Sequence, residues 1–201
     1  MLTLHDYLPS GNGYKVRLLL HQLGIPFRLV EHDILQGGTR DPDFLALNPN
    51  GRIPLLQLQD GSLLAESGAI LCYLALDSAL WPAERFERAL TLQWLFFEQN
   101  SHEPAIAVAR FSRMRPDGPH RADLPGLLER GHAALAVMER HLAGRSYFVA
   151  ERYGIADIAL YAYTHVAHEG GFDLAGYPNV RAWLERVAAQ PGHVPITWKP
   201  N

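Results

Sequence analysis

The chain has 201 residues, of which 48% are hydrophobic and 19% charged, and its formal net charge is −3. This composition predicts a globular protein rather than a disordered one, and the length is sufficient for two small domains. No run of Lys and Arg indicates a nucleic-acid or anionic-membrane partner, and no apolar stretch is long enough to span a bilayer. A lone cysteine, Cys72, and a polar start without a signal peptide lead us to expect a cytoplasmic protein.

Strand and helix signals alternate over the first third of the chain. Apolar runs bounded by turn residues predict strands, and apolar residues at helical spacing predict helices, the first of which ends at Gly24 with Pro26 beyond it. Asp60 and Gly61 predict a hairpin turn. The expected order is β-α-β-α-β-β-α, with strands at 2–5, 27–30, 54–58 and 62–65 and helices at 14–23, 42–47 and 67–76.

The remaining periodic segments are all helical. A linker with Pro82 occupies 77–84, and a loop rich in Pro, Gly and charge is expected at 115–125. Helices are expected at 85–114, 127–142, 155–168 and 179–189. The fold class is therefore an α/β domain at 1–78 followed by an all-α domain at 86–201.

Five segments, found along almost the whole chain, resemble motifs of the cytosolic glutathione S-transferase family. They are residues 10–17, 47–54, 64–70, 154–157, and the Tyr177–Pro178 pair with Trp183. They occur in the family's order and spacing, and the first is similar to bacterial serine-type or disulfide-reductase-like members. The resemblance implies a thioredoxin-like first domain, glutathione as co-substrate, and a homodimer.

Glutathione carries an ammonium and a carboxylate at its γ-glutamyl end, so a receptor needs an acid beside anion donors. Glu66 supplies the acid. Ser67 opens a helix, whose free N–H groups and positive dipole end favour a carboxylate. The alternative for both residues is plain helix capping.

The pair Ile53–Pro54 resembles the family's cis-proline turn, in which the residue before proline pairs its backbone with the cysteinyl part of glutathione. An ordinary trans proline that opens a strand is the alternative. Arg52 is a candidate for the glycyl carboxylate or a solvated surface charge. In many relatives a histidine lies in the loop before this turn, and Thr39 takes its place here.

Three residues are candidates for activating the glutathione thiol. Ser10 matches the serine-type pattern without a gap and opens the first helix, and Asn12 can add a second donor from the same turn. Tyr7 matches the tyrosine-type pattern only with a gap. The alternative is that Ser10 or Asn12 merely caps the helix.

The favoured function is transfer of glutathione to a small hydrophobic electrophile. We expect that electrophile near 100–111, with Tyr14, Phe111 and Met114 as walls or as core residues. The alternatives are a glutathione-dependent disulfide reductase or peroxidase, and a non-catalytic binding module of the same family. No histidine spacing suits a metal, so none is expected. Cys72 is expected to be a small core residue, and Asp157 to support a helix start whose cap is Gly154.

Overall fold

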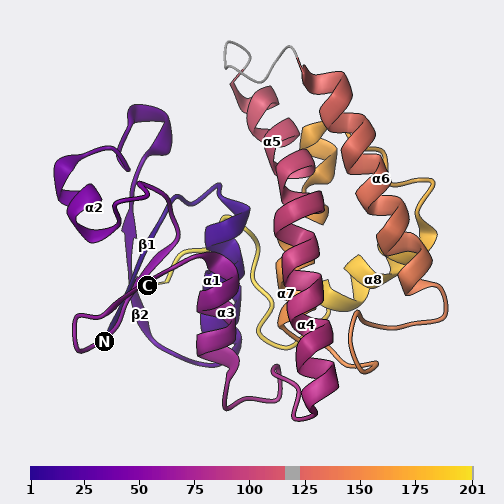
Figure 1. Cartoon of the computed structure of the whole chain (residues 1–201), viewed down its shortest axis with the longest axis horizontal. Coiled ribbons are helices and arrows are strands. Elements are labelled where there is room, and N and C mark those ends of the chain that lie inside the picture. Colours follow the sequence, from indigo (N-terminus) through magenta and orange to yellow (C-terminus); the bar gives the residue numbers. More distant parts are fainter. Residues whose placement is uncertain (116–122, 201) are drawn as a thin grey trace. The chain divides into compact units, whose positions relative to one another are not determined.

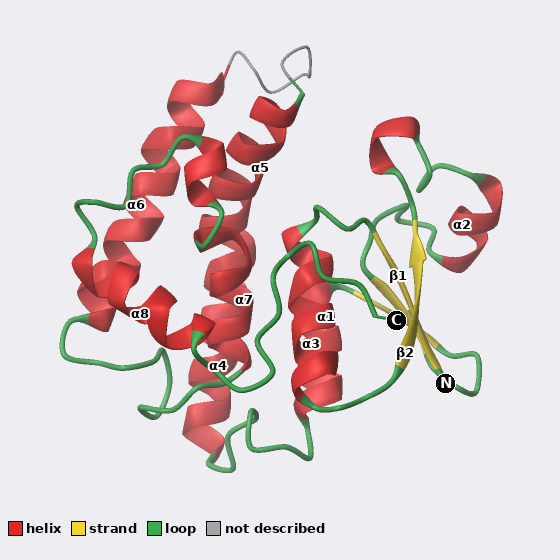
Figure 2. Ribbon diagram, turned by 180° about the vertical axis from the view of Figure 1, so that it is seen from behind, coloured by secondary structure: helices red, strands yellow, loops and turns green. Residues whose placement is uncertain are grey.

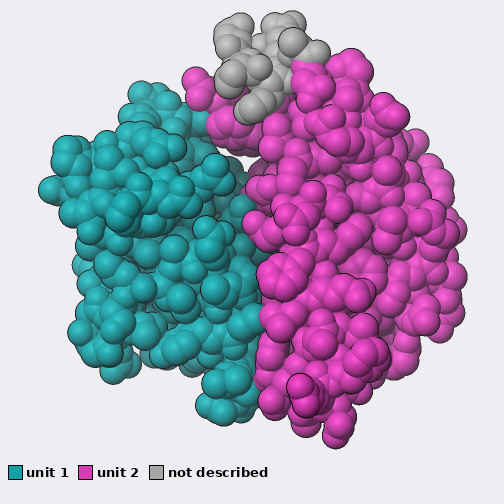
Figure 3. Space-filling view, in the orientation of Figure 1, with its two compact units in different colours: residues 1–78, 191–201 teal, residues 79–190 magenta. Residues whose placement is uncertain are grey.

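The computed structural model describes residues 1–115 and 123–200 and divides into two compact units (Figure 3). The first unit comprises Met1–Ser78 and Pro191–Asn201, and the second comprises Ala79–Gln190. The end of the chain thus groups with the first unit, whereas the sequence suggested one continuous second domain at 86–201. Among the described residues, no helix is both long and apolar enough to cross a membrane.

The first unit is a four-stranded mixed sheet with helices, of which Figure 1 labels β1, β2, α1, α2 and α3. Its elements are β1 (Leu2–Asp6), α1 (Gly11–Gln22), β2 (Phe27–Glu31), the 3-10 turn η1 (Ile34–Gln36), α2 (Pro42–Leu47), β3 (Leu55–Gln57), β4 (Leu63–Ala65) and α3 (Ser67–Ala75). The strand order is β2-β1-β3-β4, with β1 parallel to β2 and antiparallel to β3, and β3 antiparallel to β4. This is the expected thioredoxin-like arrangement.

Leucine side chains of the sheet form the centre of this unit. Leu4 of β1 lies opposite Leu29 of β2 and Leu56 of β3. The core cluster joins the sheet to one face of α1 and of α3, and its buried members are Leu4, Val16, Leu20, Phe27, Leu56 and Ile70. Because these side chains leave water together, they fix α1 and α3 against one face of the sheet (Figure 2).

The second unit is helical. Its elements are α4 (Arg85–Phe97), the π-helical turn η2 (Glu98–His102), α5 (Glu103–Met114), α6 (Leu124–Leu142), α7 (Ile155–Thr164), the 3-10 turn η4 (Ala167–Gly170) and α8 (Pro178–Ala188). Every residue of α7 is buried, so this helix forms the centre of the unit. The fold class expected from the sequence is confirmed in both units.

Some helix bounds differ from those expected. The first helix begins at Gly11 rather than at 14, because Ser10 has extended backbone and caps it. The long helix expected at 85–114 contains the π-turn η2 in its middle. The expected end of the loop at 115–125 was wrong, since α6 already begins at Leu124 with a proline in its first turn. Residues 116–122 of that loop lie outside the described part of the chain. The helix expected at 155–168 ends at Thr164.

Candidate functional site

Three chain segments meet at one edge of the sheet in the first unit. The strand register pairs His5 with Leu55 and Leu55 with Ala65, so the end of β1, the start of β3 and the end of β4 lie side by side. Candidate residues lie directly after β1 and β4, at 7–10 and 66–67, and directly before β3, at 52–54. The sheet therefore brings most of the sequence-predicted site residues together.

Ser10 forms the start of α1. Its backbone is extended (φ −71°, ψ 125°), and its Oγ accepts from the Gly13 N–H at 3.4 Å. A Cβ at Gly13 would fall 1.5 Å from Asp6 Oδ1, so only glycine lets the first turn of α1 approach the end of β1 this closely. The capping role of Ser10 is therefore present. A hydroxyl that accepts this bond still has its own proton to donate.

Lys15 links α1 to the start of α3. Its Nζ donates to Asn12 Oδ1 at 2.7 Å and to Ser67 Oγ at 3.4 Å, and the Ser67 hydroxyl lies 3.4 Å from Asn12 Oδ1. Lys15 and Ser67 are both buried. Because an ammonium only donates, the carbonyl oxygen of the Asn12 amide faces Lys15 and its NH₂ group is directed away. A positive charge thus lies beside the helix start that carries Ser67.

Glu66 has an unusual backbone. Its φ of 68° is in the left-handed half of conformational space, which non-glycine residues rarely adopt. It precedes α3 directly, its side chain makes no capping bond, and the residue is exposed. Residues held in such conformations concentrate at ligand-binding sites, where the surrounding fold compensates for the strain. The plain-capping interpretation therefore does not account for Glu66.

The Ile53–Pro54 peptide bond is cis, as the resemblance implies. Continuing the β1–β3 register places this pair beside the Asp6–Tyr7 end of β1. Arg52 is exposed, and its backbone oxygen accepts from Asn48 Nδ2 at 2.8 Å. Thr39 is buried, and its carbonyl oxygen lies against Gly51, one residue before Arg52. The loop that carries Thr39 therefore adjoins the turn.

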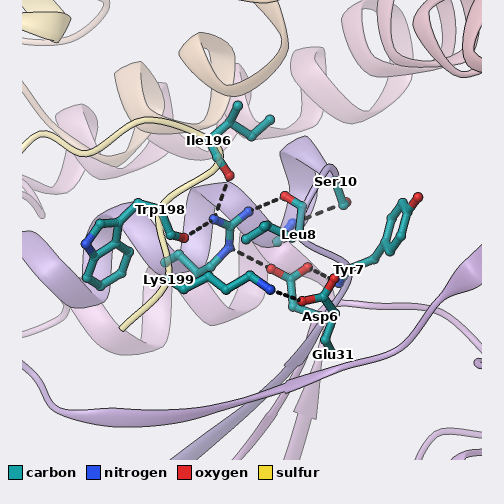
Figure 4. Close-up of polar contacts among 10 residues, drawn as sticks. Asp6, Tyr7, Leu8, Ser10, Glu31, Ile196, Trp198 and Lys199 are labelled. Atoms are coloured by element: carbon teal, nitrogen blue, oxygen red, sulfur yellow. Dashed lines mark hydrogen bonds and ion pairs between the residues drawn. The ribbon is translucent and has the colours of Figure 1, made fainter. Parts of the chain in front are cut away.

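A buried ion pair underlies the segment that carries Tyr7 and Ser10. Arg17 Nε donates to Asp6 Oδ2 at 2.8 Å, and both side chains are almost completely excluded from water. Asp6 Oδ1 accepts from the Tyr7 N–H at 2.7 Å, and Arg17 Nη2 donates to the Leu8 carbonyl at 2.6 Å (Figure 4). Burial raises the pKa of Asp6 to about 6, although Arg17 and the Tyr7 N–H oppose that rise.

Tyr7 lies in the turn between β1 and α1 and is half-buried. Its carbonyl accepts from the Ser10 N–H at 2.8 Å, and its ring points away from the Asp6 carboxylate in Figure 4. Tyr7 and Ser10 therefore belong to one turn, and both hydroxyls stay candidates for the thiol.

Asp157 has the structural position that we expected. Its Oδ2 accepts from the Gly154 N–H at 3.0 Å, and its Oδ1 accepts from Trp183 Nε1 at 2.9 Å and from the Phe148 N–H at 3.2 Å. The carbonyl of Gly154, which has no side chain, accepts from the Asp157 N–H at 3.0 Å. Burial raises the pKa of Asp157 to about 7 against these three donors. The residue holds the start of α7.

Burial bears on two other expectations. Tyr14 is fully buried and its hydroxyl donates to the Val194 carbonyl at 2.6 Å, so it is a core residue rather than a pocket wall. Cys72 is only partly buried, so it is not the fully enclosed core residue that was expected. Burial nevertheless raises the pKa of its thiol, which does not favour a role as nucleophile. Within residues 1–115 and 123–200, no group of three or more His, Cys, Asp or Glu side chains is arranged to hold a metal ion.

Sequence reasoning missed the contacts of Lys15 and Arg17, although it used both residues as parts of a motif. The spacing of Asn12 and Lys15, three apart on a helix, is a signal that could have paired them. Arg17 donates to the carbonyls of Ile196 and Trp198, and no local signal in the sequence links it to either residue. Those residues lie at the far end of the sequence.

Comparisons with known proteins agree with this architecture. The glutathione S-transferase N-terminal domain family matches residues 9–76, and the glutathione S-transferase C-terminal domain family matches residues 102–191. The disulfide-bond oxidoreductase YfcG of Escherichia coli K12 is 34% identical over 203 residues, which is 95% of this chain and 92% of that protein.

Two solved structures extend the comparison. A glutathione S-transferase from Pseudomonas fluorescens Pf-5 is 51% identical, with a TM-score of 0.94 over 97% of this chain and 98% of that one. Ure2p in complex with glutathione is 25% identical, with a TM-score of 0.85 over 95% of this chain and 90% of that one. Both halves of this chain thus have counterparts in one group of proteins, and the chain belongs to the glutathione S-transferase family.

Proposed function

We propose that this protein binds glutathione at the sheet edge of its first unit and holds it as a thiolate that reacts with a small hydrophobic electrophile. The observation that carries the proposal is the convergence of the starts of α1 and α3 with the cis Ile53–Pro54 turn. Two helix N-termini and a buried ammonium favour anions there, and glutathione carries two carboxylates and an ionisable thiol. A structure of the relative Ure2p with glutathione supports this choice of ligand.

The γ-glutamyl end of glutathione fits the start of α3. Ser67 offers its hydroxyl and the helix N–H groups to the carboxylate, and Lys15 adds a full positive charge beside it. Glu66 is exposed and directly precedes Ser67, so its carboxylate suits the ammonium of the γ-glutamyl group. This assignment gives each charged group of the γ-glutamyl end an opposite charge.

The remainder of glutathione then runs along the cis-proline turn. The backbone N–H and C=O of Ile53 suit the cysteinyl part, with Pro54 setting the turn. Arg52 is the candidate for the glycyl carboxylate, and Thr39 adjoins the same end of the site. Glutathione bound with its γ-glutamyl end at α3 and its glycyl end near Arg52 has its thiol between Ile53 and the start of α1, where Ser10 lies.

Ser10 is the proposed donor to the thiolate, with Asn12 as a second donor. A free thiol with a pKa of about 8.5 is only a few per cent ionised at neutral pH. A hydroxyl bond and the positive end of α1 both stabilise the sulfur anion, and each lowers the thiol pKa. Serine need not act as a base, because its proton stays on its own oxygen. Tyr7 is the competing candidate for this role.

The experiment compares Ser10→Ala with Tyr7→Phe. We expect Ser10→Ala to raise the pKa of bound glutathione and to lower turnover at pH 7 about ten-fold or more, as for the loss of one donor to an anion. The ultraviolet absorbance of the thiolate, titrated in each variant, measures the first effect. If Tyr7→Phe shifts the titration and Ser10→Ala does not, Tyr7 is the activating residue.

A second candidate function is glutathione-dependent reduction of a disulfide. It is favoured by the 34% identity to a protein named disulfide-bond oxidoreductase. Parallel assays with an aryl halide and with a mixed disulfide separate the two reactions. Retention on immobilised glutathione, with Glu66→Gln as the weakened control, separates both enzymes from a module that does not bind glutathione.

We also propose a homodimer, following the family. Large apolar side chains stay exposed on α4 and on or directly after α3: Tyr73 (51%), Leu76 (56%), Phe86 (74%) and Phe96 (63%). Apolar side chains of this size in contact with water favour association. Sedimentation as a stable monomer at micromolar concentration would contradict this proposal.

A further inference from the structure

The C-terminal segment, residues 191–200, is bound to α1 through its backbone. Tyr14, Arg17 and His21 are spaced three and four apart, so they share one face of the helix, which we call the tail-binding face. Tyr14 Oη donates at 2.6 Å, Arg17 Nη1 donates twice at 2.8 and 2.9 Å, and His21 Nδ1 lies 2.8 Å from its partner. The acceptors are the carbonyl oxygens of Gly192, Val194, Ile196 and Trp198.

Arg17 is the residue of this face that also holds the turn before α1. Its Nε donates to Asp6 Oδ2, and its Nη2 donates to the Leu8 carbonyl at 2.6 Å. One guanidinium therefore bridges the C-terminal segment and the turn that carries Tyr7 and Ser10, as Figure 4 shows for the carbonyls of Ile196, Trp198 and Leu8. Its planar fork fixes these directions together, which a lysine ammonium cannot do.

Hydrogen bonds link the turn to Asp6 at one end and to the first turn of α1, through Ser10, at the other. The Tyr7 N–H is held by Asp6 Oδ1, and the Ser10 N–H is held by the Tyr7 carbonyl. A shift of Asp6 or Leu8 is therefore passed along the turn to Ser10. Because catalysis depends on donors placed within a fraction of an ångström, a small displacement of the Ser10 hydroxyl is costly for reaction at the thiol.

We propose that Arg17 is a positioning residue, through which the C-terminal segment holds the turn 7–10 in place and thereby sets the position of the Ser10 hydroxyl. This inference rests on the proposed function of Ser10. Ile196 and Trp198, which are distant in sequence from the proposed glutathione site, thus act on the thiol end of that site through Arg17 and without touching it.

Two variants separate this role from plain stabilisation. A chain that ends at Val194 lacks both Arg17 acceptors in the C-terminal segment, and Arg17→Lys keeps the segment but loses the fork. Lys199→Ala is the matched control, because the Lys199 ammonium pairs with the exposed side of Glu31 and not with Arg17. Binding of S-methylglutathione, whose sulfur carries no proton, reports whether each variant still folds its γ-glutamyl site.

Hydrogen exchange of the Tyr7 and Ser10 amides is the first measurement. We expect about ten-fold or faster exchange in the truncated chain and in Arg17→Lys, since local opening of the turn becomes easier, and no change in Lys199→Ala. Wild-type exchange rates in both variants would overturn the proposal. This measurement needs no glutathione, so it stands even where the wild-type protein fails to bind glutathione and the proposed function is wrong.

Titration of bound glutathione and steady-state kinetics are the second measurement. We expect a higher thiol pKa and a saturated rate lowered about ten-fold in both variants, with S-methylglutathione affinity unchanged, because only the thiol end is displaced. A variant with faster amide exchange but a wild-type thiol titration would overturn the positioning role. Equal losses in affinity and rate would assign Arg17 to the stability of the whole unit instead.

Discussion

Asp6 in the first unit and Asp157 in the second are both buried carboxylates beside the first turn of a helix, but they are stabilised differently. Asp6 pairs with the Arg17 guanidinium, whereas Asp157 accepts from neutral donors, namely Trp183 Nε1 and two backbone N–H groups. Burial raises both pKa values, to about 6 for Asp6 and to about 7 for Asp157. A partner cation offsets more of the cost of burying a charge than neutral donors do.

The consequence differs at neutral pH. Asp6, with the lower of the two pKa values, is largely ionised at pH 7, so the turn before α1 contains a fixed ion pair. Asp157 is close to half-protonated at the same pH, and it serves as a hydrogen-bond hub for α7. The first unit thus uses a charge pair next to its proposed site, and the second uses a carboxyl that is only partly ionised to hold the start of α7.

The largest effect is expected from removing the cation. Arg17→Met leaves Asp6 buried without its charge partner and should lower the free energy of unfolding by about 3 to 5 kcal/mol, as for other broken buried pairs. Denaturant unfolding measures the loss. The matched control is Arg152→Met, which breaks the exposed Arg152–Glu87 pair and should cost less than about 1 kcal/mol. Similar losses in the two variants would contradict the contrast between buried and exposed pairs.

The pH dependence of stability should show the raised pKa of Asp157. Since its pKa in the folded state is about 7 and the ordinary value is 3.8, its contribution to stability is present in full below about pH 4 and is lost as pH rises through about 7. The wild-type advantage over Asp157→Asn should therefore shrink between pH 4 and pH 8, by at most about 4 kcal/mol. Asp6 titrates in both proteins and cancels. An advantage that grows with pH would show that Asp157 has a lowered pKa.

Removing the hub itself should have a smaller effect at neutral pH. Asp157→Ala deprives the Trp183 indole and two backbone N–H groups of their acceptor and should lower stability by about 1 to 3 kcal/mol. Glutathione affinity of the folded protein should not change. Calorimetric melting and binding on one sample measure both quantities. Unchanged melting with impaired chemistry would refute the structural role of Asp157.

The smallest effect is expected at the exposed end of the C-terminal segment. Lys199 and Glu31 form an ion pair with side chains 54% and 40% exposed, so Lys199→Ala should change stability by less than about 0.5 kcal/mol. The same denaturant experiment in low and high salt measures it. A loss comparable to that of Arg17→Met would mean that the charge of the segment, and not its backbone, holds it on α1.

Local signals account for what the sequence predicted well. Gly24, the Asp60–Gly61 turn and Ser67 mark element ends, so most strands and helices of the first unit lie within a few residues of their expected bounds. The cis bond at Pro54 followed from resemblance, since no local property of Ile53 determines it. The site segments could be found because each directly adjoins a strand of the same sheet.

The remaining features depend on contacts between distant residues. The π-turn at 98–102 has no signal in the apolar period of the long helix around it. Residues 191–200 have neither helical nor strand periodicity, and side chains of α1 determine their path. The contact of Lys15 with Ser67 and the contacts of Arg17 with Ile196 and Trp198 could not be read from the sequence, in which both residues look like solvated charges on a helix.

The alternation of the four carbonyls bound by the tail-binding face has a consequence for how the segment tolerates change. Because α1 binds oxygens of the main chain at 192, 194, 196 and 198, most side chains between them can be exchanged without altering these bonds. The spacing cannot be altered so freely. One residue inserted between Ile196 and Trp198 would lengthen the turn that the Trp198 N–H closes onto the Pro195 carbonyl at 2.9 Å. It would thereby separate the two carbonyls that Arg17 Nη1 binds together. Insertions should therefore be far less acceptable here than substitutions.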